Sequence, residues 1–325
     1  MSSKTAILTN LVLALGVGYY VSVQLDTNDV IKTLATAHAP MLALGFMTYL
    51  TNYALRAFRF NLLLDQPRAS YLRQLVTTQL HGAINYILPA RIGELSYPWL
   101  AKQIVGTRAT ESATALVLAR LFDIGVISGL VVAIIVLYGN RLPPWLVYSL
   151  LAFAITGIAM LGGGYFLGRA KATHLLPPPP STRSKLLGRV RNGFAAVGTP
   201  KALFFHFVVT ALIWLATLGN FYLVARALGF DVTIVHIVLL CALALPLSIL
   251  PTHGFANIGA HEFAWTFTFQ LLGDSHKAAL SAAVGTHVVL FVMVLAIGGL
   301  GVALCFVTNC RAIRTRHNKS SDTDS

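Results

Sequence analysis

Charged residues are scarce in this sequence. Asp, Glu, Lys and Arg make up 11% of its 325 residues, whereas soluble proteins carry roughly 25%. Acidic residues are the rarest, with 11 against 24 basic ones, and the chain has only three glutamates: Glu94, Glu111 and Glu262. Because 56% of the residues are hydrophobic, this composition excludes a soluble globular domain and predicts a polytopic membrane protein.

Other absences narrow the class. The three cysteines do not suggest a disulfide framework. The apolar segments lack the period-two alternation of a barrel strand, so the fold class is all-α. No G-x-x-x-x-G-K-[ST] loop and no H-E-x-x-H motif occurs, which argues against direct use of ATP and against a recognisable metal site. We therefore predict no cofactor and no metal.

Uninterrupted apolar stretches long enough to cross the roughly 30 Å hydrocarbon layer recur along the chain. They are Thr5–Gln24, Ala39–Leu64, Glu111–Tyr138, Pro144–Gly168, Ala202–Leu228 and Ala278–Thr308. The first is too apolar for too long to be a typical secretory signal, so we expect an uncleaved helix. The sequence thus predicts one integral membrane domain over residues 1–309 and a short basic tail over residues 310–325.

The basic residues predict how the chain crosses the membrane. Seven lie between Arg169 and Lys201 with no acidic residue among them, and four more lie in the tail. By the positive-inside rule, loop 169–201 and both termini should be cytoplasmic. We expect the cell (plasma) membrane as the location. The short loops expected outside lie near Asp26 and Asp29, Arg141, Asp231, and Asp274 to Lys277.

Two further apolar regions, 70–104 and 231–272, are broken by proline, glycine and charged residues. Counting crossings from a cytoplasmic N-terminus makes the first broken segment enter and leave from inside and the second from outside. Entry from opposite faces is typical of an inverted-topology repeat with a site near the membrane midplane. The count does not distinguish re-entrant segments from pairs of full helices, because both return to the side of entry.

The two breaks carry similar motifs, LPARIGE ending at Glu94 and LPTHGFANIGAHE ending at Glu262. An ionisable group at membrane depth is costly unless it faces protein or water. Pro89 and Pro251 bend or end a helix, and the freed backbone groups survive only against protein or a wet cavity. We therefore predict one shared polar cavity. Its candidate residues are Asn85, Arg91, Glu94, His253, Asn257, His261 and Glu262, with His81 nearby.

A further pair of charges lies in the stretch after the first break. Arg120 and Asp123 are spaced i,i+3, so they can meet on one helix face. They form either a structural ion pair or part of a polar pathway. For Arg91, Glu94 and Glu262 the structural alternative is a satisfied cap at a broken helix end, and for the histidines it is packing. We expect Arg56 and Arg59 to be interfacial anchors that extend toward water.

Together these residues resemble the transmembrane region of lysylphosphatidylglycerol synthases and its stand-alone, flippase-like relatives. The resemblance rests on Asn85, the segment from Leu88 to Glu94, Arg120 and Asp123, and the Pro251 to Glu262 segment. It implies an integral membrane protein that moves lipids or lipid-linked groups between leaflets. The fused synthases also carry a large soluble aminoacyl-transferase domain. The longest hydrophilic stretch here is loop 169–201, so we do not expect that activity.

The sequence therefore favours a protein that moves an anionic phospholipid or polyprenyl-linked headgroup across the bilayer. An arginine would attract the phosphate, while the carboxylates bind an amine, hold the arginines or carry a proton. A membrane-embedded lipid-modifying enzyme and a non-transporting scaffold are the alternatives. Membrane lipids are the expected partners and nucleic acid is not. A homo-oligomer or a separately encoded lipid-modifying enzyme would also be compatible with this interpretation.

Overall fold

The computed structural model describes residues 27–64, 71–172, 199–247 and 255–308, together with Gly16, Tyr19, Val23 and Gln24. These residues form helices and contain no strand, which confirms the all-α membrane class. Four helices are long and apolar enough to cross a membrane, and α2 and α3, bent by 84°, add a fifth when counted as one span. The predicted first span, most of loop 169–201 and the tail lie outside the described residues.

The long helices match the predicted apolar stretches to within a few residues. They are α3 (Ala39–Leu63), α6 (Ala109–Tyr138), α7 (Pro144–Ala172), α9 (Pro200–Ala227) and α12 (His276–Val307). Capping side chains explain where two of these helices begin. The Thr199 hydroxyl accepts from the Ala202 N–H at the start of α9, and Ser275 does the same for Ala278 at the start of α12, as N-cap residues do.

A short helix, α2 (Thr27–Ala35), precedes α3. The sequence predicts a short external loop near Asp26 and Asp29, and part of this connection is helical. The segment has the pattern of a helix, with Asp29 in its first turn and Lys32 in its last, which suits the helix dipole. The Asp29 carboxylate also lies 3.7 Å from the Lys277 ammonium at the start of α12.

The first broken segment consists of α4 (Tyr71–Ile87), a 3₁₀ helix η1 (Pro89–Leu95), α5 (Ser96–Leu100) and a π-helical turn η2 (Ala101–Val105). The second consists of α10 (Ile234–Leu247), the turn η4 (Phe255–Asn257) and α11 (Ala260–Leu271). The described α-helical parts of their arms have 17, 5, 14 and 12 residues, shorter than the about 20 needed for a full crossing. These lengths favour a re-entrant path, and we call the two regions the re-entrant segments.

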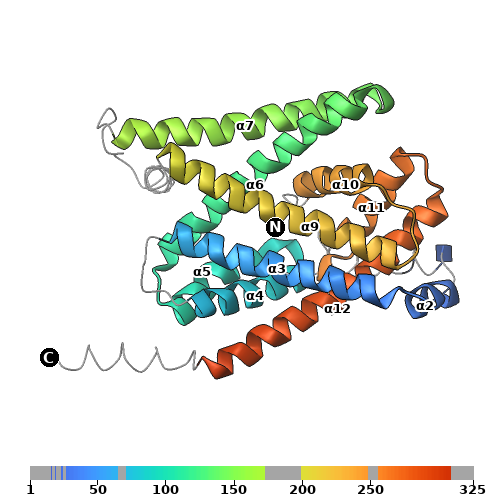
Figure 1. The fold of residues 1–325 in the computed structure, drawn as a ribbon, viewed down its shortest axis with the longest axis horizontal. Helices are drawn as coiled ribbons and strands as arrows, with labels where there is room; N and C mark the ends of the chain where they lie inside the picture. The colour runs from blue at the N-terminus through green and yellow to red at the C-terminus, as the bar shows by residue number, and fades with distance from the viewer. Residues whose placement is uncertain are drawn as a thin grey trace.

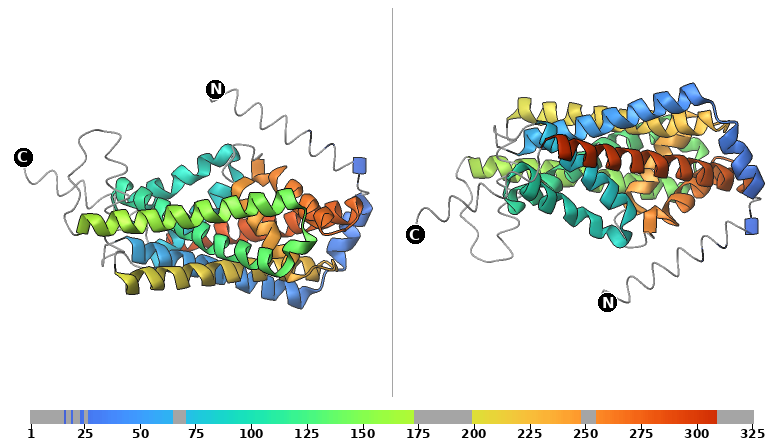
Figure 2. Two further views of the ribbon diagram at one scale, coloured as in Figure 1. Left: turned by 90° about the horizontal axis from the view of Figure 1, so that it is seen from above. Right: turned by 90° about the horizontal axis from the view of Figure 1, so that it is seen from below.

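The two re-entrant segments enter from opposite ends of the bundle. In Figure 1, α4 and α5 lie at the end where α12 finishes, whereas α10 and α11 lie toward the end where α2 is found. Figure 2 shows the end of α7 and the end of α12 on the same side in both views. The turn η3 (Gly139–Arg141) joins α6 to α7 at the other side.

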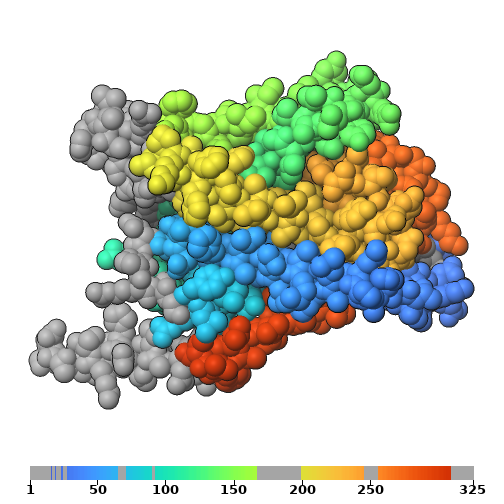
Figure 3. Space-filling model, in the orientation of Figure 1, coloured from blue at the N-terminus to red at the C-terminus, as the bar shows by residue number. Residues whose placement is uncertain are grey.

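Helix packing connects the two re-entrant segments. α12 follows the second segment and packs on α4, while α6 follows the first segment and packs on α10. At the centre, α3 packs along α9, as the space-filling view shows for one face of the molecule (Figure 3). The helix that follows each re-entrant segment therefore packs on the first arm of the other segment. This reciprocal arrangement is expected of an inverted-topology repeat.

Candidate functional site

Gly93 sets the shape of the first break. α4 ends at Ile87, Leu88 is extended, and Pro89 begins η1, because a proline nitrogen cannot continue a helical hydrogen-bond ladder. A Cβ on Gly93 would lie 2.3 Å from the Asn85 Cα. Only glycine allows η1 to lie this close to the α4 backbone. This contact brings the next residue, Glu94, toward α6.

Glu94 is bonded to Arg120. An Arg120 Nη2–H donates to the Glu94 Oε1 at 2.6 Å, and Arg120 Nη1 lies 3.3 Å from the Asp123 Oδ2. The predicted Arg120 and Asp123 pair is therefore present, and it extends into the first break. The His81 Nε2 lies 4.0 Å from the second Glu94 oxygen, and the His81 Nδ1 is 2.9 Å from the Ser96 hydroxyl.

The chain of charges continues to Arg59 on α3. Arg59 donates to both Asp123 oxygens, at 2.6 and 3.4 Å, and the Trp214 indole of α9 donates to the same carboxylate at 3.3 Å. The prediction that Arg59 is an interfacial anchor is wrong, because this residue is 2% exposed. A buried guanidinium needs a carboxylate partner, and packing of α3 against α6 supplies one.

The second break uses unusual backbone conformations. Ala256, Asn257 and Gly259 have φ values of 54°, 64° and 93°, so the chain turns sharply before α11. The Glu262 carboxylate accepts from the Gly259 N–H at 2.7 Å, an N-cap contact of the kind weighed from the sequence. Pro251 and His253 lie outside the described residues, and so does the side chain of Arg91 in the first break.

His287 of α12 completes the second break, and the sequence analysis missed it. The Nε2 atom lies 2.9 Å from the Ala256 carbonyl oxygen, and the Nδ1 atom is hydrogen-bonded to Glu262. A carbonyl only accepts, so Nε2 carries a hydrogen. A further proton must then lie between Nδ1 and the carboxylate, so the Glu262–His287 pair is neutral overall.

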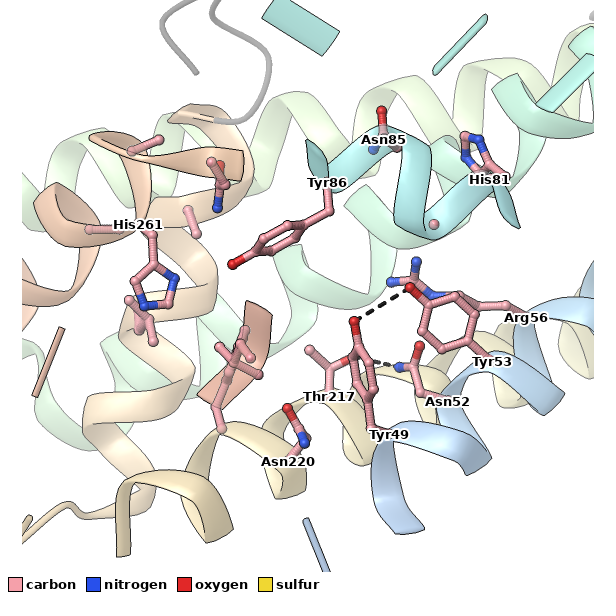
Figure 4. Close-up of a pocket in the computed structure, with 18 of the residues that line it drawn as sticks. Tyr49, Asn52, Tyr53, Arg56, His81, Asn85, Tyr86, Thr217, Asn220 and His261 are labelled. Atoms are coloured by element: carbon pink, nitrogen blue, oxygen red, sulfur yellow. Dashed lines mark hydrogen bonds between the residues drawn. The ribbon is translucent and has the colours of Figure 1, made fainter. Parts of the chain in front are cut away.

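A cavity of about 300 Å³ lies between the two breaks. It is lined from α4 by His81, Asn85 and Tyr86 and from the second segment by Asn257 and His261, and Figure 4 shows Tyr86 extending into it from α4. Arg120 also lines it. Of the predicted site residues, Asn85, Arg120, Asn257 and His261 thus meet at one cavity.

The glutamates are placed differently from our expectation. Neither Glu94 nor Glu262 is among the lining residues, and each is bonded to a neighbour instead: Arg120 and His287. Asp123 is likewise held by arginines away from the lining. Charge pairing explains this arrangement, because a carboxylate at low dielectric is most stable beside a cation.

Further lining residues come from α3, and the sequence analysis did not select them. They are Tyr49, Asn52, Tyr53 and Arg56. Arg56 is therefore a cavity residue rather than an interfacial anchor. The sequence did indicate them, because these polar positions recur at the three- and four-residue spacing of one helix face. Thr217 and Asn220 of α9 line the cavity beside them, and Asn52 donates to the Thr217 hydroxyl at 2.7 Å (Figure 4).

Comparison with known proteins finds related membrane proteins. Residues 7–298 match the family described as "Lysylphosphatidylglycerol synthase TM region". The chain is also 24% identical over 290 residues to a UPF0104 membrane protein of Methanothermobacter thermautotrophicus, and the alignment covers 83% of this chain and 85% of that protein.

Proposed function

The chain belongs to the family of the lysylphosphatidylglycerol synthase TM region, and on this premise we propose that it moves a phosphate-bearing lipid headgroup between leaflets of the plasma membrane. The observation that carries the proposal is the charge of the cavity lining. Two arginines, Arg56 and Arg120, face a cavity of about 300 Å³ whose described lining residues include no carboxylate.

Arg56 is the free cation of this site. Among the described residues it has no ion-pair partner, and its guanidinium lies 5.9 Å from the Tyr53 ring centroid. Its buried Nε has no hydrogen-bond partner within the described part of the chain. A half-buried cation without a counter-ion has lost part of its hydration, so an anionic ligand would be favoured at this position.

Arg120 would act beside it as an oriented donor. Its Nη atoms are bonded to Glu94 and Asp123, while its buried Nε has no partner in the described residues. The two carboxylates hold the guanidinium in one orientation, which lowers the entropy that a phosphate contact would cost. A phosphate placed between Arg56 and Arg120 would receive charge-assisted hydrogen bonds from both.

The size of the cavity supports headgroup transfer with the lipid chains outside. Its volume of about 300 Å³ lies at the small end of ligand pockets, which suits a headgroup and not two acyl chains. Apolar side chains such as Val136, Phe204 and Phe306 are exposed on the long helices, where a hydrocarbon chain can stay in lipid. The protein then shields only the polar part, whose transfer through hydrocarbon is expensive.

The test is a leaflet-specific assay in reconstituted vesicles with the full chain and a phosphatidylglycerol reporter. Arg56→Gln should slow reporter movement about tenfold or more, since a hydrogen bond to a charged group is worth about 1.5–3 kcal/mol. Arg141→Gln is the matched control, because Arg141 also lies over a tyrosine ring, at 6.0 Å, but outside the cavity. Unchanged movement in folded Arg56→Gln would refute the proposal. Covalently altered reporter lipid would instead favour the enzyme alternative.

A further inference from the structure

We infer that the cavity selects a phosphodiester lipid with one negative charge whose headgroup beyond the phosphate is an uncharged polyhydroxyl group. Glycerol, inositol and a sugar share this chemistry. The inference rests on the proposed function and names its substrate class. It depends on two observations: the net charge of the described groups around the cavity and the uncharged polar groups of its lining.

Among the side chains that the structure describes, the charges in and next to the cavity leave a single positive excess. Arg56, Arg59 and Arg120 carry three positive charges, and Glu94 and Asp123 carry two negative ones. The Glu262–His287 pair holds a proton between its partners and adds no net charge. With the other histidines neutral, one phosphodiester would balance the excess. A headgroup with an additional ammonium group would restore it in a site of low dielectric constant.

No described feature of the lining offers a place for an ammonium group. The described lining residues include no Asp or Glu, and the nearby carboxylates of Glu94 and Asp123 are already held by arginines. An aromatic ring can also bind a cation, but Arg56 already lies over Tyr53, and Tyr49 faces Tyr53 edge-on with ring centroids 5.2 Å apart. An incoming ammonium would therefore meet like charge, which disfavours it.

The described lining also offers uncharged polar groups among its apolar side chains, as hydroxyl recognition requires. The Asn85 Oδ1 and the Tyr86 hydroxyl are buried and have no hydrogen-bond partner within the described residues. Figure 4 shows the Tyr86 hydroxyl directed toward the space between His261 and Tyr49. Asn257 lines the same space from the second break. A buried polar atom without a partner is costly, so hydroxyl groups that complete these bonds would be favoured.

The Tyr86 position links this specificity to the two breaks. Its ring lies 6.1 Å from the His287 ring at an interplanar angle of 81°, so α4 of the first segment touches the residue that holds Glu262 of the second. A headgroup bonded to Tyr86 would thus contact both halves of the repeat. This is the position from which a substrate can influence how the two halves move against each other.

The experiment compares lipids in vesicles that contain the full chain. Phosphatidylglycerol, phosphatidylinositol and a polyprenyl-phosphate sugar form the polyhydroxyl arms, and phosphatidylethanolamine and aminoacylated phosphatidylglycerol form the amine arms. We expect at least one polyhydroxyl arm to move about tenfold or more faster than both amine arms. The fastest arm identifies whether the hydroxyls come from a glycerolipid or from a lipid-linked sugar.

Tyr86→Phe tests the hydroxyl contact, with phosphatidic acid as a lipid that has the phosphate without the polyol. The variant should lower the rate ratio of the preferred lipid to phosphatidic acid about fivefold to tenfold, and Tyr148→Phe on the exposed face of α7 should leave it unchanged. Equal movement of amine and polyhydroxyl lipids by the folded wild type would overturn this inference and leave the proposed function standing. If no lipid moves, both this inference and the proposed function fail.

Discussion

Arg59 on α3 and Asp123 on α6 form a buried ion pair, with a 2.6 Å contact between Nη1 and Oδ1 and side chains that are 3% and 5% exposed. Breaking a buried pair leaves an uncompensated charge at a cost of about 3–5 kcal/mol. We expect Asp123→Asn to lower the thermal stability of the purified protein strongly. Differential scanning fluorimetry in detergent would measure this.

Two double variants separate the partners of Asp123. Arg59→Gln with Asp123→Asn removes both charges of the buried pair and leaves the Arg120–Glu94 contact of 2.6 Å in place, so stability should recover relative to Asp123→Asn. Arg120→Gln with Asp123→Asn leaves Arg59 without its carboxylate and should not recover. Equal stability of the two double variants would contradict the central role of Arg59.

Gly93 should be intolerant of a side chain. An alanine Cβ there would meet the Asn85 Cα at 2.3 Å and the Asn85 nitrogen at 2.9 Å, and backbone atoms cannot move aside as a flexible side chain can. Gly93→Ala should therefore displace the first break and reduce both folded yield and lipid movement. Gly129→Ala in α6 is the control, since its Cβ would meet nothing within 4 Å and alanine favours a helix by about 1 kcal/mol. A stable, active Gly93→Ala protein would refute this packing argument.

His287 should contribute more to the free energy of unfolding than an ordinary buried histidine. His287→Ala leaves the Ala256 carbonyl and the Glu262 carboxylate without the partner shown here, and we expect a loss of about 3–5 kcal/mol in unfolding free energy. His206→Ala is the control, because His206 is similarly buried at 6% but its Nδ1 has no partner in the described chain. Equal losses would show that packing alone explains the histidine.

Glu262→Gln tests whether the second break needs the proton shared by Glu262 and His287 or only their hydrogen-bond geometry. A glutamine oxygen can still accept from the Gly259 N–H, while its amide N–H can donate to the His287 Nδ1. Stability by the same unfolding assay should stay within about 1 kcal/mol of wild type. A large loss would indicate that the shared proton and its charge are needed to hold the second break.

The topology can be tested at described positions in a background without native cysteines. Asn140 lies in the turn between α6 and α7, at the end of the bundle opposite to Lys201 at the start of α9. We propose that the basic segment before α9 is cytoplasmic. A cysteine at Asn140 should then react with an impermeant reagent in intact cells, and one at Lys201 should not. The reverse pattern would invert the orientation while keeping the fold.

Much of this architecture follows from the sequence by itself. The scarcity of charge and the long apolar stretches determine the membrane class, because only helices with internally bonded backbones can cross hydrocarbon in this way. The paired LPARIGE and Pro251 to Glu262 motifs located both breaks, since proline and glycine act on the local backbone. Arg120 and Asp123 were found together because a spacing of three residues on a helix brings side chains into contact.

Only the tertiary structure decided which distant groups meet. Arg59 lies 64 residues from Asp123 and His287 lies 25 residues from Glu262, and no local rule relates these pairs. Arg56 and Arg59 are three residues apart on α3, yet one lines the cavity and the other is sealed in an ion pair. The packing of α3 against α6 and α9 makes that difference, because burial and the nearest opposite charge are properties of the assembled helices.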